Sequence, residues 1–292
     1  MTKRILLTGA NGFVGRHIIK RLKKEGAEVF ALVRSKNKLH DLHNCVDKLF
    51  EMDIDNISDN IFDELGKPDV MIHLAWGGLP NYQSLHHYEE ELPRQYSFLK
   101  AMILGGVKSV VISGTCFEYG MQDGCLSEEN ITNPTNSYGF AKDSLHRQLL
   151  FLSKEMPFNL AWCRLFYIWG EGQSEQSLYM QLRAAVERGD VEFNMSLGEQ
   201  LRDYLYIEDV ADILVRISMR NKSTTTLNIA SGKPISVKKL VEKWIETNDW
   251  KIKLNLGYYP YSSFEPMKFW GSRKQLDMML ESDFKYGEKN DI

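Results

Sequence analysis

Residues 8–15 of this 292-residue chain read Thr8-Gly9-Ala10-Asn11-Gly12-Phe13-Val14-Gly15. They follow a short apolar run, Arg4–Thr8, and open an amphipathic segment, Gly15–Lys24, which predicts a strand, a turn and a helix in that order. In such a turn the first glycine permits a sharp bend, the second lets the backbone approach a pyrophosphate, and the third lets the helix pack closely on the strand. Because the positive helix end attracts an anion, the stretch predicts a dinucleotide-binding site.

Short aliphatic runs alternate with longer amphipathic stretches along the chain, which indicates a parallel sheet with crossover helices. The predicted strands are Arg4–Thr8, Glu28–Val33, Leu49–Met52, Val70–Leu74, Ser109–Ser113 and Leu160–Leu165. The predicted helices are Gly15–Lys24, Ile57–Leu65, Leu92–Leu104, Ser137–Lys154 (with Asn136 or Ser137 as N-cap), Tyr179–Arg188, Glu208–Met219 and Val237–Thr247. We therefore expect an α/β fold, with a doubly wound parallel Rossmann sheet and a smaller, interwoven C-terminal lobe.

No repeat, low-complexity tract or long linker separates two independent units in the sequence. We expect residues 1–169 to form the dinucleotide-binding Rossmann domain. Residues 170–292 should form mainly a substrate-binding lobe, with segments that return to the core at about 201–235.

The composition argues against several classes of protein. The chain has 36 Lys and Arg against 39 Asp and Glu, and no block of like charges, so a nucleic-acid partner is not expected. No apolar run approaches the roughly 18 residues of a membrane span, and no secretory segment opens the chain, so we expect a cytoplasmic protein. The four cysteines and seven histidines show no CxxC, HxxxH or HxH spacing, and we expect no metal site.

Tyr138 and Lys142 stand four residues apart on a predicted helix, and therefore on one of its faces. An ammonium group beside a phenol favours the phenolate, so we expect Lys142 to lower the pKa of Tyr138 and prepare it for proton transfer. Tyr96 and Lys100 repeat the spacing on another predicted helix, where we interpret them as a solvent-facing or packing pair.

The strand before Tyr138 ends in the hydroxyl cluster Ser113-Gly114-Thr115, at the edge where parallel sheets bind ligands. Thr115 can there hydrogen-bond a carbonyl or alkoxide while Tyr138 exchanges its proton. The pattern therefore predicts Thr115, Tyr138 and Lys142 as catalytic residues.

These motifs, together with the segment Ser113–Gly120, resemble the extended short-chain dehydrogenases/reductases of the epimerase/dehydratase type, which act on nucleotide sugars. The resemblance covers nearly the whole chain. It implies hydride transfer to or from a nicotinamide cofactor, whose ribose Lys142 also holds. It further implies a homodimer, since many relatives pair the two long helices that follow the fourth and fifth strands.

The end of the second predicted strand favours NADPH over NADH. An NAD site places a carboxylate there for the ribose 2′-hydroxyl, whereas this chain has Arg34, Ser35 and Lys36. A guanidinium can clamp a 2′-phosphate, although a solvated basic turn is the alternative interpretation.

The resemblance also implies the other cofactor contacts. Asp53 matches the residue that reaches the adenine, and His73-Leu74-Ala75-Trp76 resembles a His-Leu-Ala-Ala turn beside the cofactor, with Trp76 in place of the usual alanine. His73 has either a packing role or a direct contact. The predicted cofactor-binding residues are Gly9, Asn11, Gly12, Phe13, Val14, Gly15, Arg34, Asp53, Ile54, Leu74, Ala75, Trp76, Tyr138 and Lys142.

Two departures from family patterns narrow the reaction. Nucleotide-sugar 4,6-dehydratases place an Asp-Glu pair directly after the catalytic threonine, whereas this chain has Cys116 and Phe117, so dehydration is disfavoured. Reductive epimerases resembling GDP-fucose synthase use a cysteine one position later and a distant histidine. No histidine follows His146, which disfavours epimerisation, and Cys116 can instead be a small buried apolar side chain.

The resemblance also implies substrate contacts in the smaller lobe. Arg202 falls on an Arg-Asp-Tyr motif whose arginine contacts the substrate pyrophosphate, and the alternative is a structural ion pair with Asp203 or Asp209. Tyr167 replaces an asparagine that contacts the sugar in epimerases, and Arg273 is a second candidate phosphate ligand in a stretch, 264–274, that lacks the usual Arg-Pro-Gly-Asp run. The predicted substrate-binding residues are Thr115, Cys116, Phe117, Tyr167, Arg202 and Arg273.

The intact Thr/Tyr/Lys set, the basic end of the second strand and the missing dehydration acids predict one activity best. It is the NADPH-dependent reduction of a nucleotide-linked 4-keto-6-deoxyhexose, most simply of the dTDP-4-dehydro-6-deoxyglucose type, to a deoxysugar donor. One alternative is a 4-epimerase that retains and recycles NAD. Another is a Rossmann protein that senses NADPH without chemistry.

Overall fold

A computed structural model describes residues 2–220, 223–262 and 265–280 of the chain. Its centre is a seven-stranded parallel sheet in the order β12-β7-β5-β4-β1-β2-β3. The strands are β1 (Arg4–Thr8), β2 (Glu28–Val33), β3 (Lys48–Glu51), β4 (Val70–His73), β5 (Ser109–Thr115), β7 (Asn159–Leu165) and β12 (Thr225–Ile229). The doubly wound α/β fold is therefore confirmed, with the strand order reversing between β1 and β4.

The sequence predicted six of these strands, and the seventh, β12, joins the edge of the sheet beside β7. Its sequence, Thr225–Ile229, has two threonines and an asparagine among its five residues, so it lacks the apolar run of the other strands. Pairing with β7 places this segment at the edge of the sheet.

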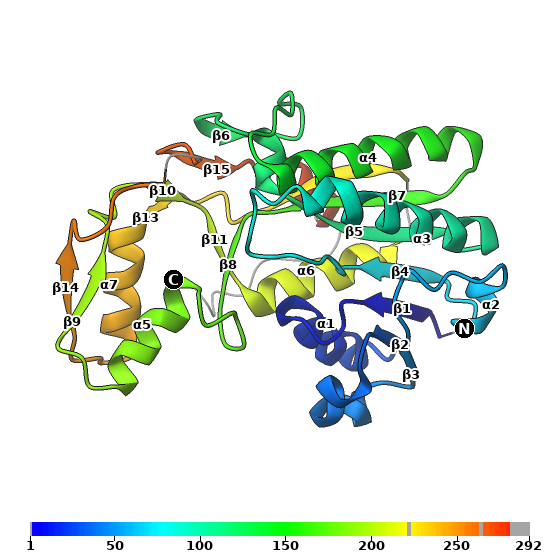
Figure 1. Cartoon of the computed structure of the whole chain (residues 1–292), viewed down its shortest axis with the longest axis horizontal. Coiled ribbons are helices and arrows are strands. Elements are labelled where there is room, and N and C mark those ends of the chain that lie inside the picture. The colour runs from blue at the N-terminus through cyan, green and yellow to red at the C-terminus, as the bar shows by residue number, and fades with distance from the viewer. Residues whose placement is uncertain (1, 221–222, 263–264, 281–292) are drawn as a thin grey trace.

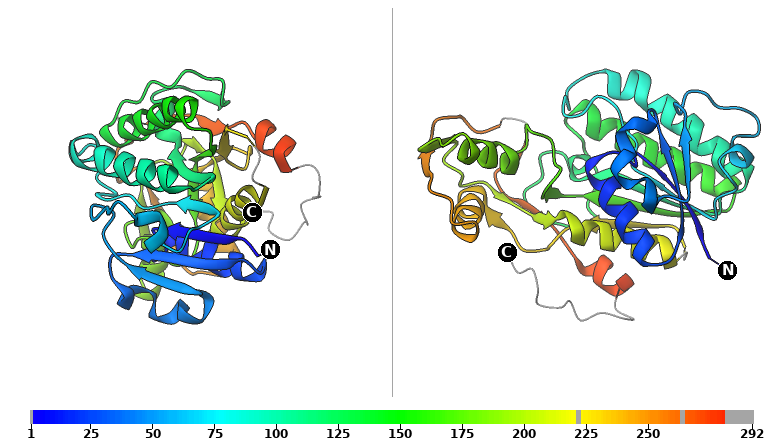
Figure 2. Two further views of the ribbon diagram at one scale, coloured as in Figure 1. Left: turned by 90° about the vertical axis from the view of Figure 1, so that its right-hand side faces the viewer. Right: turned by 90° about the horizontal axis from the view of Figure 1, so that it is seen from below.

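Helices cover both faces of the sheet, as Figures 1 and 2 show. On one face lie α1 (Phe13–Lys24), α6 (Ile207–Arg220) and the short α8 (Lys274–Leu280), and on the other lie α3 (Leu92–Gly105) and α4 (Ser137–Glu155). Alternate residues of each strand face opposite layers, so that Ile5 and Leu7 of β1 join the first core and Leu6 joins the second.

Most predicted helices form within one or two residues of their expected ends. Asn136 is the N-cap of α4, where its Oδ1 accepts a hydrogen bond of 2.8 Å from the amide of Gly139. The exception is the predicted helix Ile57–Leu65, which is wrong for its first half: α2 spans only Ile61–Glu64. Asp53–Asn60 is rich in Asp, Asn and Ser, whose side chains favour turns over helix.

Three short helical turns lie at the sheet's loops and were not predicted. A 3₁₀ segment, η1 (Lys36–Cys45), follows β2, a π-helical turn, η2 (His87–Glu91), leads into α3, and a 3₁₀ turn, η3 (Cys116–Tyr119), follows β5. The last two lie at the carboxyl edge of the sheet, next to residues described below.

Beyond β7 the chain builds a smaller lobe, seen at the far end from the N-terminus in Figure 1. It contains α5 (Leu178–Glu187), β9 (Glu192–Met195), α7 (Val237–Thr247) and β14 (Lys253–Leu256), which share their own apolar core. Three two-stranded pairings link this lobe to the sheet: β8 (Tyr167–Trp169) with β11 (Tyr204–Tyr206), β10 (Leu201–Arg202) with β13 (Ile235–Ser236), and β6 (Gly124–Leu126) with β15 (Phe269–Gly271). Because α6 and β12 return to the large sheet, the two parts are interwoven.

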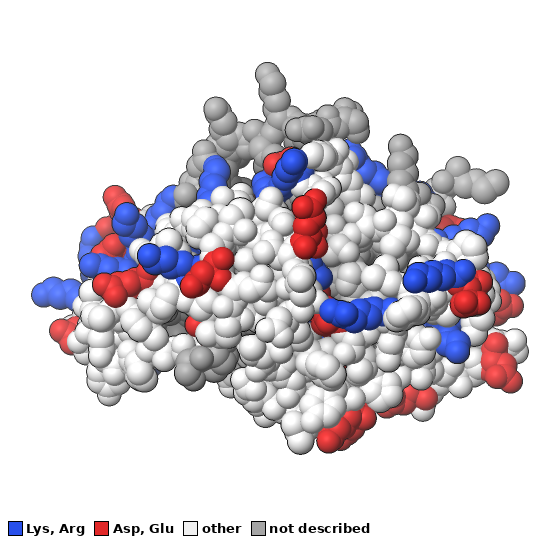
Figure 3. Space-filling view, turned by 90° about the horizontal axis from the view of Figure 1, so that it is seen from above, with Lys and Arg blue, Asp and Glu red and all other residues white. Residues whose placement is uncertain are grey.

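Acidic and basic side chains are interspersed over the face shown in Figure 3, without a large area of one sign. Among the described residues, no helix is both long and apolar enough to cross a bilayer. Within the same residues no cluster of three potential metal ligands occurs. The four cysteines form no disulfide.

Candidate active site

The glycine turn between β1 and α1 has the backbone that the sequence predicted. Gly9 adopts a positive φ of 67°, and a Cβ atom there would lie 2.9 Å from the amide nitrogen of Ala75. A Cβ atom on Gly15 would lie 2.3 Å from the carbonyl oxygen of Gly9, so helix α1 can approach the turn only with glycine at this position.

The turn opens into a cleft of about 320 Å³ at the carboxyl edge of the sheet, within the usual range for ligand sites. Nine residues of the predicted cofactor set line it, namely Gly9, Asn11, Gly12, Arg34, Asp53, Ile54, Leu74, Ala75 and Trp76. Phe13, Val14 and Gly15 belong to the first turn of α1 and are not among the lining residues. Tyr138 and Lys142 also lie outside this lining. The side chain of Lys36 is outside the described part of the chain.

The cleft lies directly beside the glycine turn. Gly9, Asn11 and Gly12 of the turn line the cleft just before α1 begins, and the start of a helix favours a bound anion. Arg34 is exposed at the end of β2, on the same cleft.

Three charged or polar residues of the cleft were missed by the sequence analysis. Glu91, at the end of η2, and Arg94 and Gln95 in α3 line it together with Asp53. Arg94 binds Asp53 at 2.5 Å, Glu91 at 2.7 Å and Asp55 at 2.9 Å. The spacing of Glu91 and Arg94 on a helix suggests a local pair, but their approach to Asp53 depends on tertiary structure.

His73 belongs to a buried chain of hydrogen bonds beneath the cleft. Its Nδ1 lies 2.9 Å from Oγ1 of Thr8, and its Nε2 lies 2.8 Å from Oε1 of Gln95. Burial lowers the pKa of His73 to about 3, so the ring is neutral, donates from Nε2 to Gln95 and accepts at Nδ1 from Thr8. Gln95 in turn donates to Glu91 at 2.8 Å. Of the two interpretations of His73, the geometry favours the packing role.

The three predicted catalytic residues meet at the junction of β5 and α4. Thr115 is the last residue of β5, and Tyr138 lies in the first turn of α4, where the Thr115 side chain acts to lower the pKa of the phenol. Lys142 lies one turn further along α4, with Nζ 5.9 Å from the centre of the Tyr138 ring and 2.8 Å from the carbonyl oxygen of Ser113.

The prediction that Lys142 lowers the pKa of Tyr138 is wrong for the protein without cofactor or substrate, because the pKa is raised. Burial of the phenol is the largest influence and raises its pKa, with Tyr82, Glu118 and Cys116 acting in the same direction. Burial also lowers the pKa of Lys142 to about 7. The sequence pattern supplies the right neighbours, but it does not reveal that the site removes both groups from water.

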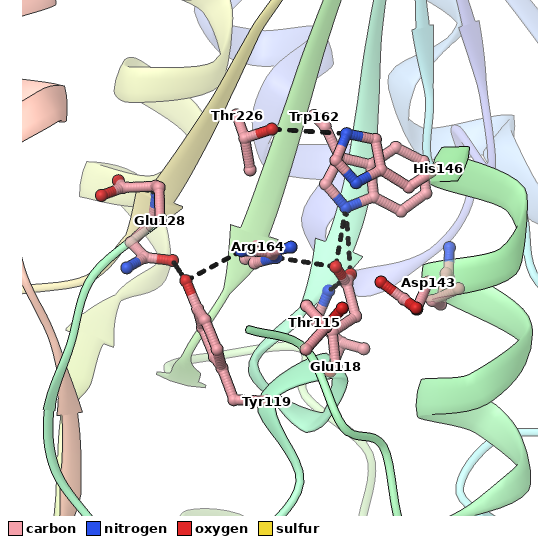
Figure 4. Close-up of polar contacts among 12 residues, drawn as sticks. Thr115, Glu118, Tyr119, Glu128, Asp143, His146, Trp162, Arg164 and Thr226 are labelled. Carbon is pink, nitrogen blue, oxygen red and sulfur yellow. Dashed lines mark hydrogen bonds and ion pairs between the residues drawn. The ribbon is translucent and has the colours of Figure 1, made fainter. Parts of the chain in front are cut away.

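Glu118 accepts a hydrogen bond from the backbone amide of Thr115. The sequence analysis had assigned this glutamate no role. Figure 4 shows its carboxylate accepting hydrogen bonds from the amide of Thr115 at 2.8 Å, from Nε1 of Trp162 at 3.0 Å and from Nε of Arg164 at 2.7 Å. Glu118 is wholly buried and the Arg164 side chain is 5% exposed. The Thr115 side chain also accepts the amide proton of Phe117, which completes a capping box on η3.

Cys116 and Phe117 have apolar surroundings. Cys116 is buried, and burial raises the pKa of its thiol, so that it stays protonated. The ring of Phe117 packs on that of Tyr82, with centres 5.0 Å apart, and Tyr82 packs in turn on Tyr138 at 5.6 Å. Neither position supplies an acid or a base beside Tyr138.

Arg202 and Tyr167 lie together on a second cleft, of about 260 Å³, which is also lined by residues of α5 and β9 in the smaller lobe. Both bind the carboxylate of Glu265, Tyr167 through its hydroxyl at 2.7 Å and Arg202 through Nη2 at 2.9 Å. Arg202 therefore forms a structural ion pair, but with Glu265 and not with Asp203 or Asp209 as the alternative expectation had it. Asp203 instead accepts hydrogen bonds from residues 231 and 232.

Arg273 is not brought to either cleft. Its Nε binds Asp277 at 2.7 Å and its Nη1 binds the carbonyl oxygen of Ala230 at 3.0 Å, at the start of α8. Phe264, in the same stretch of sequence, lies outside the described residues.

The chain is similar to known proteins over most of its length. The model of the "NAD dependent epimerase/dehydratase family" matches residues 5–230. The dTDP-6-deoxy-L-talose 4-dehydrogenase (NAD(+)) of Aggregatibacter actinomycetemcomitans is 30% identical over 273 residues, which cover 92% of this chain and 99% of that protein. The UDP-glucose 4-epimerase of Halalkalibacterium halodurans is 24% identical over 306 residues, covering 97% and 91%.

Among solved structures, MoeE5 in complex with UDP-glucuronic acid and NAD superposes with a TM-score of 0.82 and 25% identity, covering 97% of this chain and 94% of that one. The glycine turn, the cleft beside it and the Thr115–Tyr138–Lys142 group thus occur in a chain whose sequence matches the family model over most of its length. This chain is an enzyme of the NAD dependent epimerase/dehydratase family.

Proposed function

We propose that this enzyme reduces the 4-keto group of a nucleotide-linked 4-keto-6-deoxyhexose with NADPH, which yields a deoxysugar donor for polysaccharide biosynthesis. The observation that carries the proposal is the meeting of Thr115, Tyr138 and Lys142 at the carboxyl end of β5. A keto oxygen placed between the two hydroxyl groups has a hydrogen-bond donor and a proton source within one site. We also propose that the enzyme acts in the cytoplasm.

A nicotinamide cofactor bound in the cleft beside Gly9 and Gly12 would supply a hydride for carbon 4 of the sugar. The charge that develops on the keto oxygen is neutralised by the proton of Tyr138, which gives the alcohol and a phenolate. The Thr115 hydroxyl accepts from the amide of Phe117, and we propose that it donates its own hydrogen to the keto oxygen when the substrate lies between Thr115 and Tyr138. Lys142, as an ammonium group, stabilises the phenolate until solvent returns the proton.

The surroundings of Tyr138 support reduction over dehydration. Elimination of water from the sugar needs an acid and a base beside carbons 5 and 6, and the positions concerned hold a buried thiol, Cys116, and an aromatic ring, Phe117. The relative with 30% identity is named for oxidation at carbon 4 of a dTDP-linked 6-deoxyhexose. The reduction that we propose is the reverse type of step, which an enzyme catalyses through the same transition state.

We also propose that two parts of the chain bind different ligands. Residues 1–169 form the dinucleotide-binding domain and residues 170–292 form mainly the substrate-binding lobe. The second cleft supports this view, since Arg202 offers a planar fork for phosphate oxygens and all but one of the lining residues fall within 170–292. Glu265 holds this guanidinium in place, and its carboxylate can accept hydrogen bonds from hydroxyl groups of the same substrate.

The substrate assignment is tested with the purified enzyme and dTDP-4-keto-6-deoxyglucose, followed by its CDP- and GDP-linked analogues. We expect NADPH absorbance to decrease with at least one of them, fastest with the dTDP compound. No oxidation of NADPH or NADH with any of the three contradicts the proposal. Nicotinamide retained through purification, with 4-epimerisation that needs no added cofactor, favours the epimerase instead. NADPH binding without any turnover supports a sensor.

Arg34 supports NADPH as the preferred cofactor. Arg94, the other arginine on the cleft, is bound by three carboxylates, whereas the exposed Arg34 stands at the end of β2, where a 2′-phosphate is recognised. We expect Arg34→Ala to lower kcat/KM for NADPH by about 10- to 100-fold, the effect of losing one charge-assisted hydrogen bond. The same variant should leave kcat/KM for NADH nearly unchanged, and an equal loss with both cofactors contradicts this role.

We propose a homodimer that pairs α3 and α4. Phe140 and Phe151 are 50% and 67% exposed, and their separation of eleven residues, about three turns, puts them on one face of α4. Leu104 of α3 is 54% exposed. An apolar face of this kind is typical of an interface between subunits. We expect Phe151→Asp to give monomers in sedimentation velocity, and Val191→Asp, in the smaller lobe, to leave the dimer intact. A wild-type monomer contradicts the proposal.

A further inference from the structure

Trp76 follows β4 at the position where the resembling family usually has alanine, and its indole makes three contacts. The face of the ring covers Lys142, with Nζ 4.0 Å from the ring centre. The ring of Tyr138 packs edge-on at 5.9 Å. The indole Nε1 donates a hydrogen bond of 3.1 Å to Nδ1 of His87. One side chain therefore touches two of the three residues that we assign to catalysis.

The orientation of the indole is held by a second buried group. Nε2 of His87 lies 2.9 Å from the carbonyl oxygen of Asn81, and a carbonyl can only accept, so this nitrogen carries the proton. Nδ1 is then left as the acceptor for Trp76. His87 is fully buried and burial lowers its pKa, so this neutral tautomer persists.

Lys142 has few other partners that favour its charge. The side chain is fully buried, and within the described residues its only hydrogen-bond acceptor is the carbonyl of Ser113, at 2.8 Å. Glu118 and Glu91 are the carboxylates that act on it, and both are already bound by arginines, Arg164 and Arg94. The face of an indole is the most electron-rich aromatic surface that a protein can offer to a cation.

We propose that Trp76 is a positioning residue for Lys142: its indole face holds the buried side chain as an ammonium group beside Tyr138. The contact compensates part of the cost of burying the charge, which a small side chain at this position does not. The inference about these two side chains is independent of the substrate. Its consequence for the reaction rate rests on the proposed function.

Other titratable groups around Lys142 come from three elements besides its own helix. Glu118 from η3 and Glu91 from η2 favour the ammonium form. His73 from β4 and His87 from η2 are neutral rings whose pKa values Lys142 helps to lower, so they add no positive charge at neutral pH. Burial opposes the effect of the two carboxylates and lowers the pKa of Lys142 to about 7. A change in one contact of Lys142 therefore alters its charge at physiological pH.

The test is a direct titration of Lys142 in the full-length protein without added cofactor. Protein labelled with ¹³C-lysine is followed by NMR, and the ¹³Cε signal of Lys142 is assigned by its loss in Lys142→Met. Trp76→Leu keeps the site apolar but removes the aromatic face, and we expect the titration midpoint to fall by about one pH unit. Trp76→Phe keeps an aromatic face without the His87 hydrogen bond, and its midpoint should stay close to that of the wild type.

Two results overturn the proposal. One is a wild-type midpoint in Trp76→Leu, and the other is an equal shift in Trp76→Leu and Trp76→Phe, which assigns the effect to packing or to the His87 hydrogen bond. Tyr96→Phe, beside the exposed Lys100 on α3, is the matched control and should leave the Lys142 signal unchanged. Under the proposed function, the alkaline limb of kcat/KM against pH moves down by the same amount in Trp76→Leu. A shifted NMR midpoint without turnover leaves this inference standing and counts against the function instead.

Discussion

Tyr138→Phe is expected to lower kcat for reduction about a thousandfold, the middle of the range measured for loss of a general acid. The phenylalanine ring can keep the contacts with Trp76 and Tyr82, so the variant removes the hydroxyl and little else. The Thr115 hydroxyl still orients the keto oxygen, but no group remains to protonate the alkoxide. Burial raises the pKa of Tyr138, so the phenol is protonated over the whole assay range and the loss should be nearly independent of pH.

The measurement is single-turnover reduction with saturating NADPH, together with NADPH affinity by fluorescence titration. Affinity should change less than about threefold, since the hydroxyl acts on the reacting oxygen. Tyr96→Phe is the control, because Tyr96 and Lys100 share the spacing of Tyr138 and Lys142 but lie on α3, away from β5. Activity within tenfold of wild type in Tyr138→Phe contradicts the catalytic assignment.

Glu118→Gln is expected to lower the free energy of unfolding by about 3–5 kcal/mol, because it leaves the guanidinium of Arg164 buried without a negative partner. Arg164 also binds the Tyr119 hydroxyl at 3.0 Å, and Tyr119 binds Asn228 of β12 at 2.7 Å. The loss therefore affects a network that joins three strands. Glutamine is close to glutamate in size, so the change tests charge and not packing.

Urea denaturation followed by circular dichroism measures this effect. Asp69→Asn, which breaks the exposed ion pair with Arg4, should leave the midpoint almost unchanged. Glu118→Gln should also lower kcat more than it raises KM, since Glu118 accepts a hydrogen bond from the amide of Thr115. A stability equal to that of the wild type refutes the assignment of Glu118 and Arg164 as a critical buried pair.

Much of the fold could be predicted because the signals are local. The glycine turn at 8–15 has a backbone that only glycine allows at Gly9 and Gly15, and four residues of helix put Tyr138 and Lys142 on one face wherever α4 packs. Strands that are buried on both faces have long apolar runs. The first half of Ile57–Leu65 was misjudged because its residues favour turns, and β12 was not among the strands given bounds because its pairing with β7 is distant in sequence.

The candidate site depends far more on contacts that are distant in sequence. Glu118 meets Arg164 46 residues later, and Arg202 meets Glu265 after 63 residues. No periodicity links such pairs, because each is created by strands and loops that the fold brings together.

By itself, the sequence determined the Rossmann topology, the glycine turn and the identity of the Thr/Tyr/Lys group, since these follow from backbone sterics and helix geometry. Tertiary structure alone decided the protonation of that group. Burial outweighs the attraction between Tyr138 and Lys142, raising the pKa of the phenol and lowering that of the amine. The packed fold also places the indole face of Trp76 over Lys142, with Nζ 4.0 Å from the ring centre. Solvent exclusion is a property of the packed protein, because it depends on every element around the site and not on the residues that form it.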